Sequence, residues 1–226
     1  MNAPVITTIC VPPGDELIEG IVLRSLRQTT EVLEHCRRVA AVDVATPIVR
    51  ECLAMRNWEI VELAAGAPPR MSALLAEAVA LVRGDAPFVL TVEHDTLIQP
   101  GALELLGAAL ERCPHAAGIE ALSVDPDGRP IRPCIAYRQV DAPGQVDLAE
   151  CPDGIGFNTT LWRMAALDAV DWSRLPAWQK ADTALCRQAA VAGWSTYLHR
   201  RARTVHLRAN VGPAMRAWRE SLEWRA

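Results

Sequence analysis

The sequence of 226 residues lacks the features that mark secreted, membrane-spanning and zinc-binding proteins. Its N-terminal segment, MNAPVITTIC, contains neither a basic stretch nor an apolar segment of signal-peptide length. No apolar run reaches the ~18 residues that a membrane helix needs. The seven cysteines include no Cys-x-x-Cys pair, and disulfide frameworks and zinc sites both need paired spacing. We therefore expect a cytoplasmic protein whose cysteines are mostly small core residues.

A strong charge of either sign is also missing. The formal net charge is −4, so the composition gives no general attraction to nucleic acid. No low-complexity tract, internal repeat or linker interrupts the chain, and 50% of its residues are hydrophobic. This length and composition predict a single domain with a full hydrophobic core.

What the sequence does contain is an apolar segment that ends in three polar side chains. Phe88–Val92 is apolar or β-branched, as in a strand buried within a sheet, and Glu93, His94 and Asp95 follow it directly. After a Pro-Gly pair, apolar residues recur with helical spacing over Ala102–Leu110, which predicts a helix there. In open α/β sheets, ligands bind beyond the carboxyl ends of the strands. The three polar residues therefore predict a functional site.

Strands and helices alternate through the first half of the chain. Apolar and β-branched segments predict strands over residues 5–11, 39–44, 58–63 and 88–93. Apolar residues with helical spacing predict helices over residues 17–26, 49–55, 72–84 and 102–110. This alternation is typical of parallel βαβ units and predicts the α/β fold class.

The second half of the chain has a different pattern. Residues 117–124 and 131–140 are expected to pair as a hairpin around the turn at 125–130, and a loop follows. We expect a short helix from Leu161, capped by Asn158 or Thr159, and a longer helix over residues 182–192. Two final strands over 194–198 and 204–207 precede a closing amphipathic helix over 213–224.

Glu93 and Asp95 are two residues apart at a strand end. If the extended geometry continues, both carboxylates leave the same face of the strand. Two carboxylates on one side of a crevice suit a hard divalent cation such as Mg²⁺ or Mn²⁺, which in turn binds phosphate. The alternative is an ordinary solvated strand end.

Four segments, in this order, resemble the GT-A glycosyltransferases, particularly the large inverting family 2. The run VRGDAPFVLTVEHDTLIQPGALELL is similar to the family's central strand, where an Asp-x-Asp motif precedes Pro-Gly and a helix. VAAVDVATP resembles its second strand, GFNTTLWRMAAL its acceptor segment, and KADTALCRQAAVAGWSTYLHRRARTVH its catalytic helix and terminal strand. The resemblance spans Val5 to about His206. It implies a single-domain GT-A (nucleotide-diphospho-sugar transferase) fold with a mixed, mostly parallel sheet flanked by helices.

The resemblance also implies a function and roles for five residues. It implies a metal-dependent, inverting, hexosyltransferase-like glycosyltransferase that moves a sugar from a nucleotide diphosphate donor to an acceptor hydroxyl. Mn²⁺ or Mg²⁺ would be held by Asp95 and His206, with Glu93 beside them and near the donor. Asp182 matches the general base, and Asp43 matches the residue that holds the base of the nucleotide. Each of three residues also has a purely structural alternative. Asp182 would be a helix N-cap, His206 a packed strand histidine and Asp43 a turn residue.

Further contacts to donor and acceptor are expected from four residues. Relatives often carry Asn at the position of Ala76, and Arg70 is our candidate to replace part of that donor contact. Arg208 belongs to a basic run that suits the diphosphate, an anionic membrane surface or plain solvent. Trp178 offers a flat aromatic surface for the acceptor, or a core residue, and Asn158 lies in the acceptor segment.

Departures from the family pattern keep two other functions open. Glu93 stands where the first Asp of the motif is usual, and Ala181 stands where Glu precedes the catalytic Asp, as in a non-catalytic GT-A-like protein that binds a nucleotide or glycan. A sugar nucleotidyltransferase shares the sheet, but usually opens with a Gly-rich loop, and VPPGDE has one glycine.

The expected domain plan and partners follow from the same resemblance. Residues 1–112 are the nucleotide-binding half, residues 113–208 the acceptor-binding half, and residues 209–226 a C-terminal helix. The expected partners are a nucleotide diphosphate sugar and a glycan, lipid-linked or small-molecule acceptor, and not nucleic acid. Peripheral membrane contact and a homodimer stay open.

Overall fold

The computed structural model describes residues 3–11, 14, 16–62, 71–131, 138–141, 144, 146–177 and 180–207. The strands are β1 (Val5–Cys10), β2 (Arg38–Val44), β3 (Glu59–Glu62), β4 (Phe88–Glu93), β5 (Thr96–Ile98), β6 (Ala116–Val124), β7 (Val140–Asp141), β8 (Leu148–Glu150), β9 (Thr159–Arg163) and β10 (Ser195–His206). The helices are α1 (Glu16–Val32), α2 (Pro47–Met55), α3 (Met71–Val82), α4 (Ala102–Arg112), α6 (Met164–Asp168), α7 (Ala181–Val191) and the 3₁₀ turn η1 (Trp172–Arg174).

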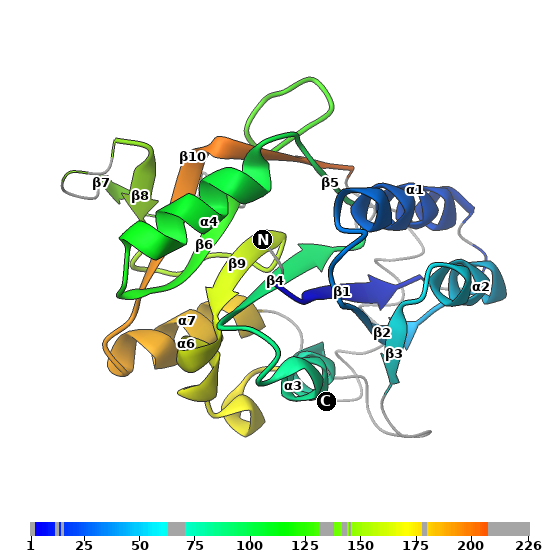
Figure 1. The fold of residues 1–226 in the computed structure, drawn as a ribbon, viewed down its shortest axis with the longest axis horizontal. Coiled ribbons are helices and arrows are strands. Elements are labelled where there is room, and N and C mark those ends of the chain that lie inside the picture. The colour runs from blue at the N-terminus through cyan, green and yellow to red at the C-terminus, as the bar shows by residue number, and fades with distance from the viewer. Residues whose placement is uncertain are drawn as a thin grey trace.

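One mixed sheet runs through the described part of the molecule, with helices on both faces (Figure 1). The strand order is β3-β2-β1-β4-β9-β6-β10-β8-β7, and β5 pairs with β10. Strands β3, β2, β1 and β4 are parallel, as the alternation of strands and helices predicts. Because they are neighbours and parallel, their carboxyl ends share one edge of the sheet.

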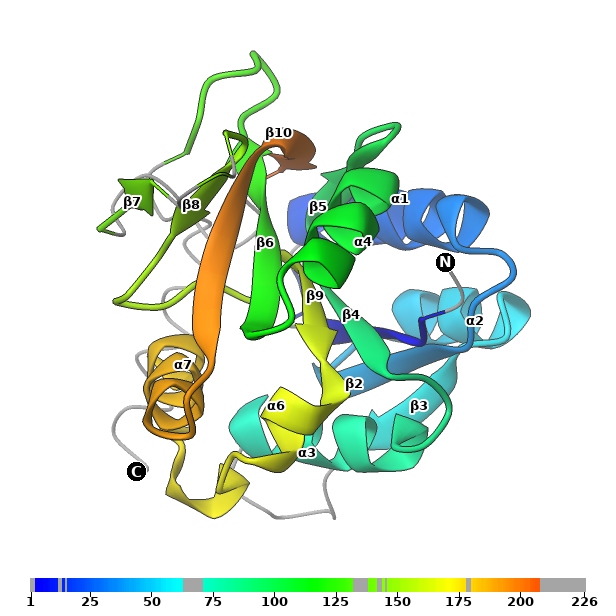
Figure 2. The ribbon, with the colours of Figure 1, turned by 60° about the vertical axis from the view of Figure 1, so that its left-hand side comes forward.

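Two layers of helices bury the two faces of the sheet (Figures 1 and 2). Helices α1, α2 and α4 place apolar residues such as Val22, Leu53 and Leu106 in one core. Helices α3, α6 and α7 place others, such as Leu74 and Leu185, in a second core on the opposite face. The sheet is therefore covered on both sides, which explains why its central strands are almost continuously apolar.

Strand β9 corrects the helix expected from Leu161. Residues 159–163 lie between β4 and β6 and pair antiparallel with both. The two threonines and Trp162 are β-formers, and every side chain from Thr159 to Trp162 is buried, so sheet packing outweighs the local cap signal. Trp162 packs over Gly118, where a Cβ atom would lie 2.5 Å from its ring. The short helix begins only at Met164.

Strand β10 joins the two expected final strands into one. Its irregular middle lies between His199 and Arg203, where the register with β6 shifts. There the Nδ1 atom of His199 accepts hydrogen bonds from the amides of Arg201 (3.2 Å) and Ala202 (3.1 Å). The imidazole thus satisfies backbone groups that the bulge removes from the ladder, and the strand continues to His206.

Three short strands were not predicted, namely β5, β7 and β8. The hairpin expected over 117–140 is seen only at its turn, where the amide of Ile131 donates to the carbonyl of Ser123 (3.0 Å). Residues 132–137 lie outside the described residues, and Val140 pairs with β8 instead. The closing helix expected over 213–224 also lies outside them.

The cysteines that the structure describes are free, and most are buried. Within the described ranges, no helix has the length and apolar character to cross a membrane.

Candidate metal and nucleotide site

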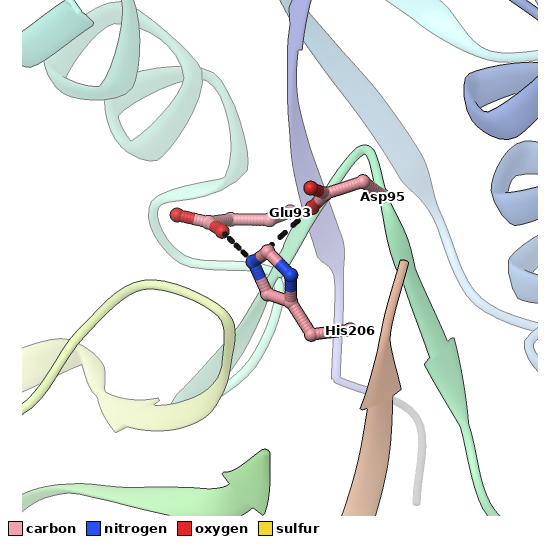
Figure 3. Close-up of side chains that lie close together, drawn as sticks. All are labelled: Glu93, Asp95 and His206. Carbon is pink, nitrogen blue, oxygen red and sulfur yellow. Dashed lines mark hydrogen bonds and ion pairs between the residues drawn. The ribbon is translucent and has the colours of Figure 1, made fainter. Parts of the chain in front are cut away.

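Glu93, Asp95 and His206 meet at the carboxyl edge of the parallel strands (Figure 3). The Nε2 atom of His206 lies 3.3 Å from a carboxylate oxygen of Glu93 and 3.6 Å from one of Asp95. The two acids do not lie along one extended strand, since β4 ends at Glu93 and His94 and Asp95 form a turn. The turn, rather than strand alternation, brings the two carboxylates together.

Strand β5 places Asp95 beside His206. It follows the turn and pairs antiparallel with the end of β10, so that Thr96 lies opposite His206. The amide of Leu207 also donates to the carbonyl of Asp95 (2.7 Å). A histidine more than a hundred residues away in the chain is thereby fixed against the acidic turn.

Helix α1 holds β5 in position through side chains that bond to its backbone. The amide group of Gln28 donates to the carbonyl of Ile98 (2.7 Å) and accepts from its amide (3.1 Å). The hydroxyl of Ser25 donates to the carbonyl of Thr96 (2.7 Å). These bonds substitute for a neighbouring strand on that side of β5.

The residues of this cluster fit a divalent cation. Each offers one ligand atom, and these atoms all lie within 4.8 Å of one another. Asp95 is 1% and His206 6% exposed, while Glu93 is partly open to solvent. Two carboxylates so close together repel each other, and a cation among them compensates that charge. Carboxylate oxygens suit Mg²⁺ and Mn²⁺, and imidazole adds a ligand that favours transition metals.

Asp182 lies in the first turn of α7, and it is not the N-cap, because Lys180 occupies that position. One oxygen of its carboxylate accepts a hydrogen bond from the amide of Thr183 (2.7 Å). Burial raises the pKa of Asp182, and the negative charge of Glu93 raises it further. Asp182 therefore belongs to the same electrostatic environment as the candidate metal site.

Asp43 lies near the end of β2, on the same edge of the sheet as Glu93. The Sγ atom of Cys10, at the end of β1, lies 4.0 Å from its carboxylate. Burial raises the pKa of Asp43 to about 6. A half-buried carboxylate with a raised pKa, at the edge of the sheet where ligands bind, makes Asp43 a candidate for contact with a ligand.

Of the remaining predicted contacts, the structure describes Asn158, and the others lie outside the described residues. Asn158 is buried, and its amide nitrogen donates to Glu120 (3.0 Å). In the basic run, Arg200 and Arg201 form ion pairs with the acids Asp141 and Asp147. Arg70, Trp178 and Arg208 lie outside the part of the chain that the structure describes.

Sequence reasoning missed Glu120, which is fully buried in β6. The signal was present, because this is the one charged residue in the otherwise apolar and small run AAGIEALSV. A carboxylate within a buried strand needs hydrogen-bond donors, so a glutamate at this position predicts a polar network inside the sheet.

Neither a protein-family model nor a curated protein matches this chain. Solved structures do match over most of it. GalNAc-T7 with UDP, GalNAc and Mn²⁺ has a TM-score of 0.65 and 9% identity, over 91% of this chain and 43% of that one. The mannosyltransferase PcManGT from Pyrobaculum calidifontis, in complex with GDP-Man and Mn²⁺, has a TM-score of 0.62 and 14% identity, over 96% and 59%. S. aureus TarS 1–349 has a TM-score of 0.60 and 14% identity, over 91% and 60%.

The chain thus spans between 43% and 60% of the length of these three structures. At such identities the likeness shows the fold. The predicted α/β class, with a mixed, mostly parallel sheet flanked by helices in a GT-A arrangement, is confirmed.

Proposed function

We propose, from this GT-A fold, that the chain is a metal-dependent, inverting glycosyltransferase that moves a sugar from a nucleoside diphosphate to an acceptor hydroxyl. The observation that carries the proposal is the cluster of Glu93, Asp95 and His206 at the carboxyl edge of the parallel strands. Structures with the same fold were solved with UDP and Mn²⁺ and with GDP-Man and Mn²⁺. A ligand set that fits such a cation, at the edge where this fold class binds ligands, supports the same chemistry here.

Transfer of a sugar develops negative charge on the departing diphosphate. The cluster of two carboxylates and an imidazole would hold a divalent cation, which would supply Lewis-acid stabilisation of that charge. Asp95 and His206 are buried and fixed by β5 and β10, so they would hold the cation rigidly. Glu93, which is more exposed, would complete the set from the solvent side.

Asp182 is proposed as the general base. Its carboxylate would accept the proton of the acceptor hydroxyl as that oxygen attacks the anomeric carbon of the sugar. The raised pKa of Asp182 makes it a stronger base than an ordinary aspartate. Attack opposite the leaving diphosphate in a single displacement inverts the anomeric centre.

Thermal unfolding with a panel of nucleotides tests the proposal. UDP, GDP, dTDP and CDP are each compared with and without Mn²⁺. One nucleotide at ~100 times its Kd should add about 2.7 kcal/mol, which raises Tm by about 5–10 °C. We expect this rise only with the metal. No rise with any nucleotide would contradict the proposal, and a rise without hydrolysis or transfer of the matching nucleotide sugar would favour a non-catalytic binding protein.

Replacing Asp43 with asparagine is expected to stabilise the free protein and weaken nucleotide binding. Burial raises the pKa of Asp43 from 3.8 to about 6, so the folded state binds a proton that the unfolded chain releases. Stability therefore falls as pH rises from about 4 to 6, by about 1–3 kcal/mol, and this loss persists at pH 7.5. Asparagine does not ionise, so Asp43→Asn does not undergo this fall in stability. It also removes the charged acceptor for the N–H groups of a nucleotide base.

The measurement is Tm from pH 4 to 8, with and without the nucleotide that the panel selects. The Tm of Asp43→Asn should rise above that of the wild type as pH passes from 4 to 6, while its nucleotide-dependent rise shrinks. Glu51→Gln, on the exposed side of α2, is the matched control and should change neither quantity. If Asp43→Asn keeps the full nucleotide-dependent rise in Tm, Asp43 does not contact the nucleotide and its role is structural.

A further inference from the structure

We infer that Glu120 is a positioning residue that sets the geometry of the candidate metal site through the loop 154–158. Glu120 is 0% exposed, lies in β6, and is not one of the three candidate ligands named above. This inference rests on the proposed function, since it concerns the same metal site.

The carboxylate of Glu120 bonds to the loop 154–158 with both of its oxygens. Oε2 accepts from the amide of Gly156 (2.9 Å), and Oε1 accepts from the side-chain amide of Asn158 (3.0 Å). A buried carboxylate is costly without such donors, and with them it fixes their positions strongly. The loop is therefore held at two points by one charged group.

The loop 154–158 in turn contacts the first residue of the candidate metal site. The carbonyl of Asn158 accepts a hydrogen bond from the amide of Glu93 (2.7 Å). Asn158 thus has its side chain on Glu120 and its backbone on Glu93. A shift of this residue moves the end of β4, where the carboxylate of Glu93 begins.

The same loop packs on the helix that carries the proposed base. The amide of Ile155 donates to the Sγ atom of Cys186 (3.4 Å), one turn after Asp182 in α7. At Gly154 the backbone has φ +112°, and a Cβ atom would lie 3.0 Å from that of Cys186. The loop 154–158 is therefore a brace between the metal ligand Glu93 and helix α7, and Glu120 is what anchors it.

Reversing the polarity of one hydrogen bond tests this inference. In E120Q, the new amide nitrogen meets a donor, either Gly156 or Asn158. In N158D, two carboxylates face each other. In the double variant E120Q/N158D, the glutamine accepts from Gly156 and donates to the new carboxylate, so both hydrogen bonds are restored. Two quantities are measured for the wild type, both single variants and the double variant. They are the affinity for Mn²⁺ alone, by calorimetry, and Tm.

We expect each single variant to bind Mn²⁺ about 10-fold more weakly, as is usual for groups that orient metal ligands. The double variant should return to within about 3-fold of the wild type. E150Q is the matched control. Glu150, in β8 on the opposite side of β10 from β6, accepts a hydrogen bond from Ser195 (3.0 Å), and this glutamate-to-glutamine change should leave Mn²⁺ affinity unchanged.

Three outcomes separate this inference from others. If the single variants lower Tm but bind Mn²⁺ as the wild type does, Glu120 is merely structural and the inference is wrong. If the single variants do not fold, a double variant that folds and binds Mn²⁺ supports it, and one that does not overturns it. If the wild-type protein itself binds no Mn²⁺, the proposed function is wrong, and this inference, which depends on the same metal site, is wrong as well.

Discussion

Replacing Asp95 with asparagine should reduce Mn²⁺ affinity and sugar transfer by about 100-fold or more. The carboxylate is 1% exposed, and it lies 3.6 Å from the Nε2 atom of His206 within the candidate ligand cluster. Asparagine keeps the shape but removes the negative charge that a divalent cation needs from this side. Loss of groups that only orient metal ligands costs 10–100-fold, so loss of a ligand charge should cost at least the upper value.

The fold should survive this substitution. The hydrogen bond that the Asp95 carbonyl accepts from Leu207 is made by the backbone, and removing one of two adjacent carboxylates relieves repulsion with Glu93. Calorimetry with Mn²⁺, followed by the nucleotide panel with metal, measures the effect. Asp127→Asn, in an exposed turn, is the control and should bind as the wild type does. Wild-type Mn²⁺ affinity in Asp95→Asn would place the metal elsewhere or remove it from the mechanism.

The sequence predicts the first half of this fold well because its signals are local. Each strand of that half is a short apolar run, and each helix has its own apolar stripe. Helix α2 is predicted over residues 49–55, and it begins two residues earlier, at Pro47, where Thr46 caps it. Where local preference and tertiary packing agree, pattern reading and structure coincide.

The second half of the chain is harder to predict because tertiary contacts decide it. Asn158 and Thr159 look like helix caps, but Thr159–Arg163 lies between two strands and is buried there. The polar run after His199 looks like a break between strands, yet an imidazole closes the bulge. Neither hydrogen bonds across the chain nor burial can be read from spacing alone.

The candidate site shows the same division. A buried strand ending in Glu93, His94 and Asp95 is visible in the sequence, and it marks the site. His206 was placed there by resemblance only, and the structure explains its approach through the pairing of β5 with β10. Glu120 was not expected at all, because its partners lie in a loop more than thirty residues later.

Replacing Asp182 with asparagine should lower kcat for transfer by about 100- to 10,000-fold while leaving Mn²⁺ and nucleotide binding intact. Asparagine cannot take the proton of the acceptor hydroxyl. The hydrogen bond from the amide of Thr183 (2.7 Å) can still be accepted by the amide oxygen, so the first turn of α7 should stay in place. Steady-state kinetics with the donor that the panel selects, together with calorimetry, measures both effects.

The sign of the stability change separates a catalytic carboxylate from a structural one. Burial and the charge of Glu93 raise the pKa of Asp182, so its ionised form destabilises the folded protein as pH rises through that pKa. Asp182→Asn should therefore have a Tm at pH 7.5 equal to or above that of the wild type, together with a large loss of kcat. If Asp182→Asn instead has a lower Tm and proportionately weaker nucleotide binding, Asp182 stabilises helix α7 and does not act as the general base. Full transfer activity in a folded Asp182→Asn protein would exclude it as the base, and the proton would then have to go to another group near the acceptor.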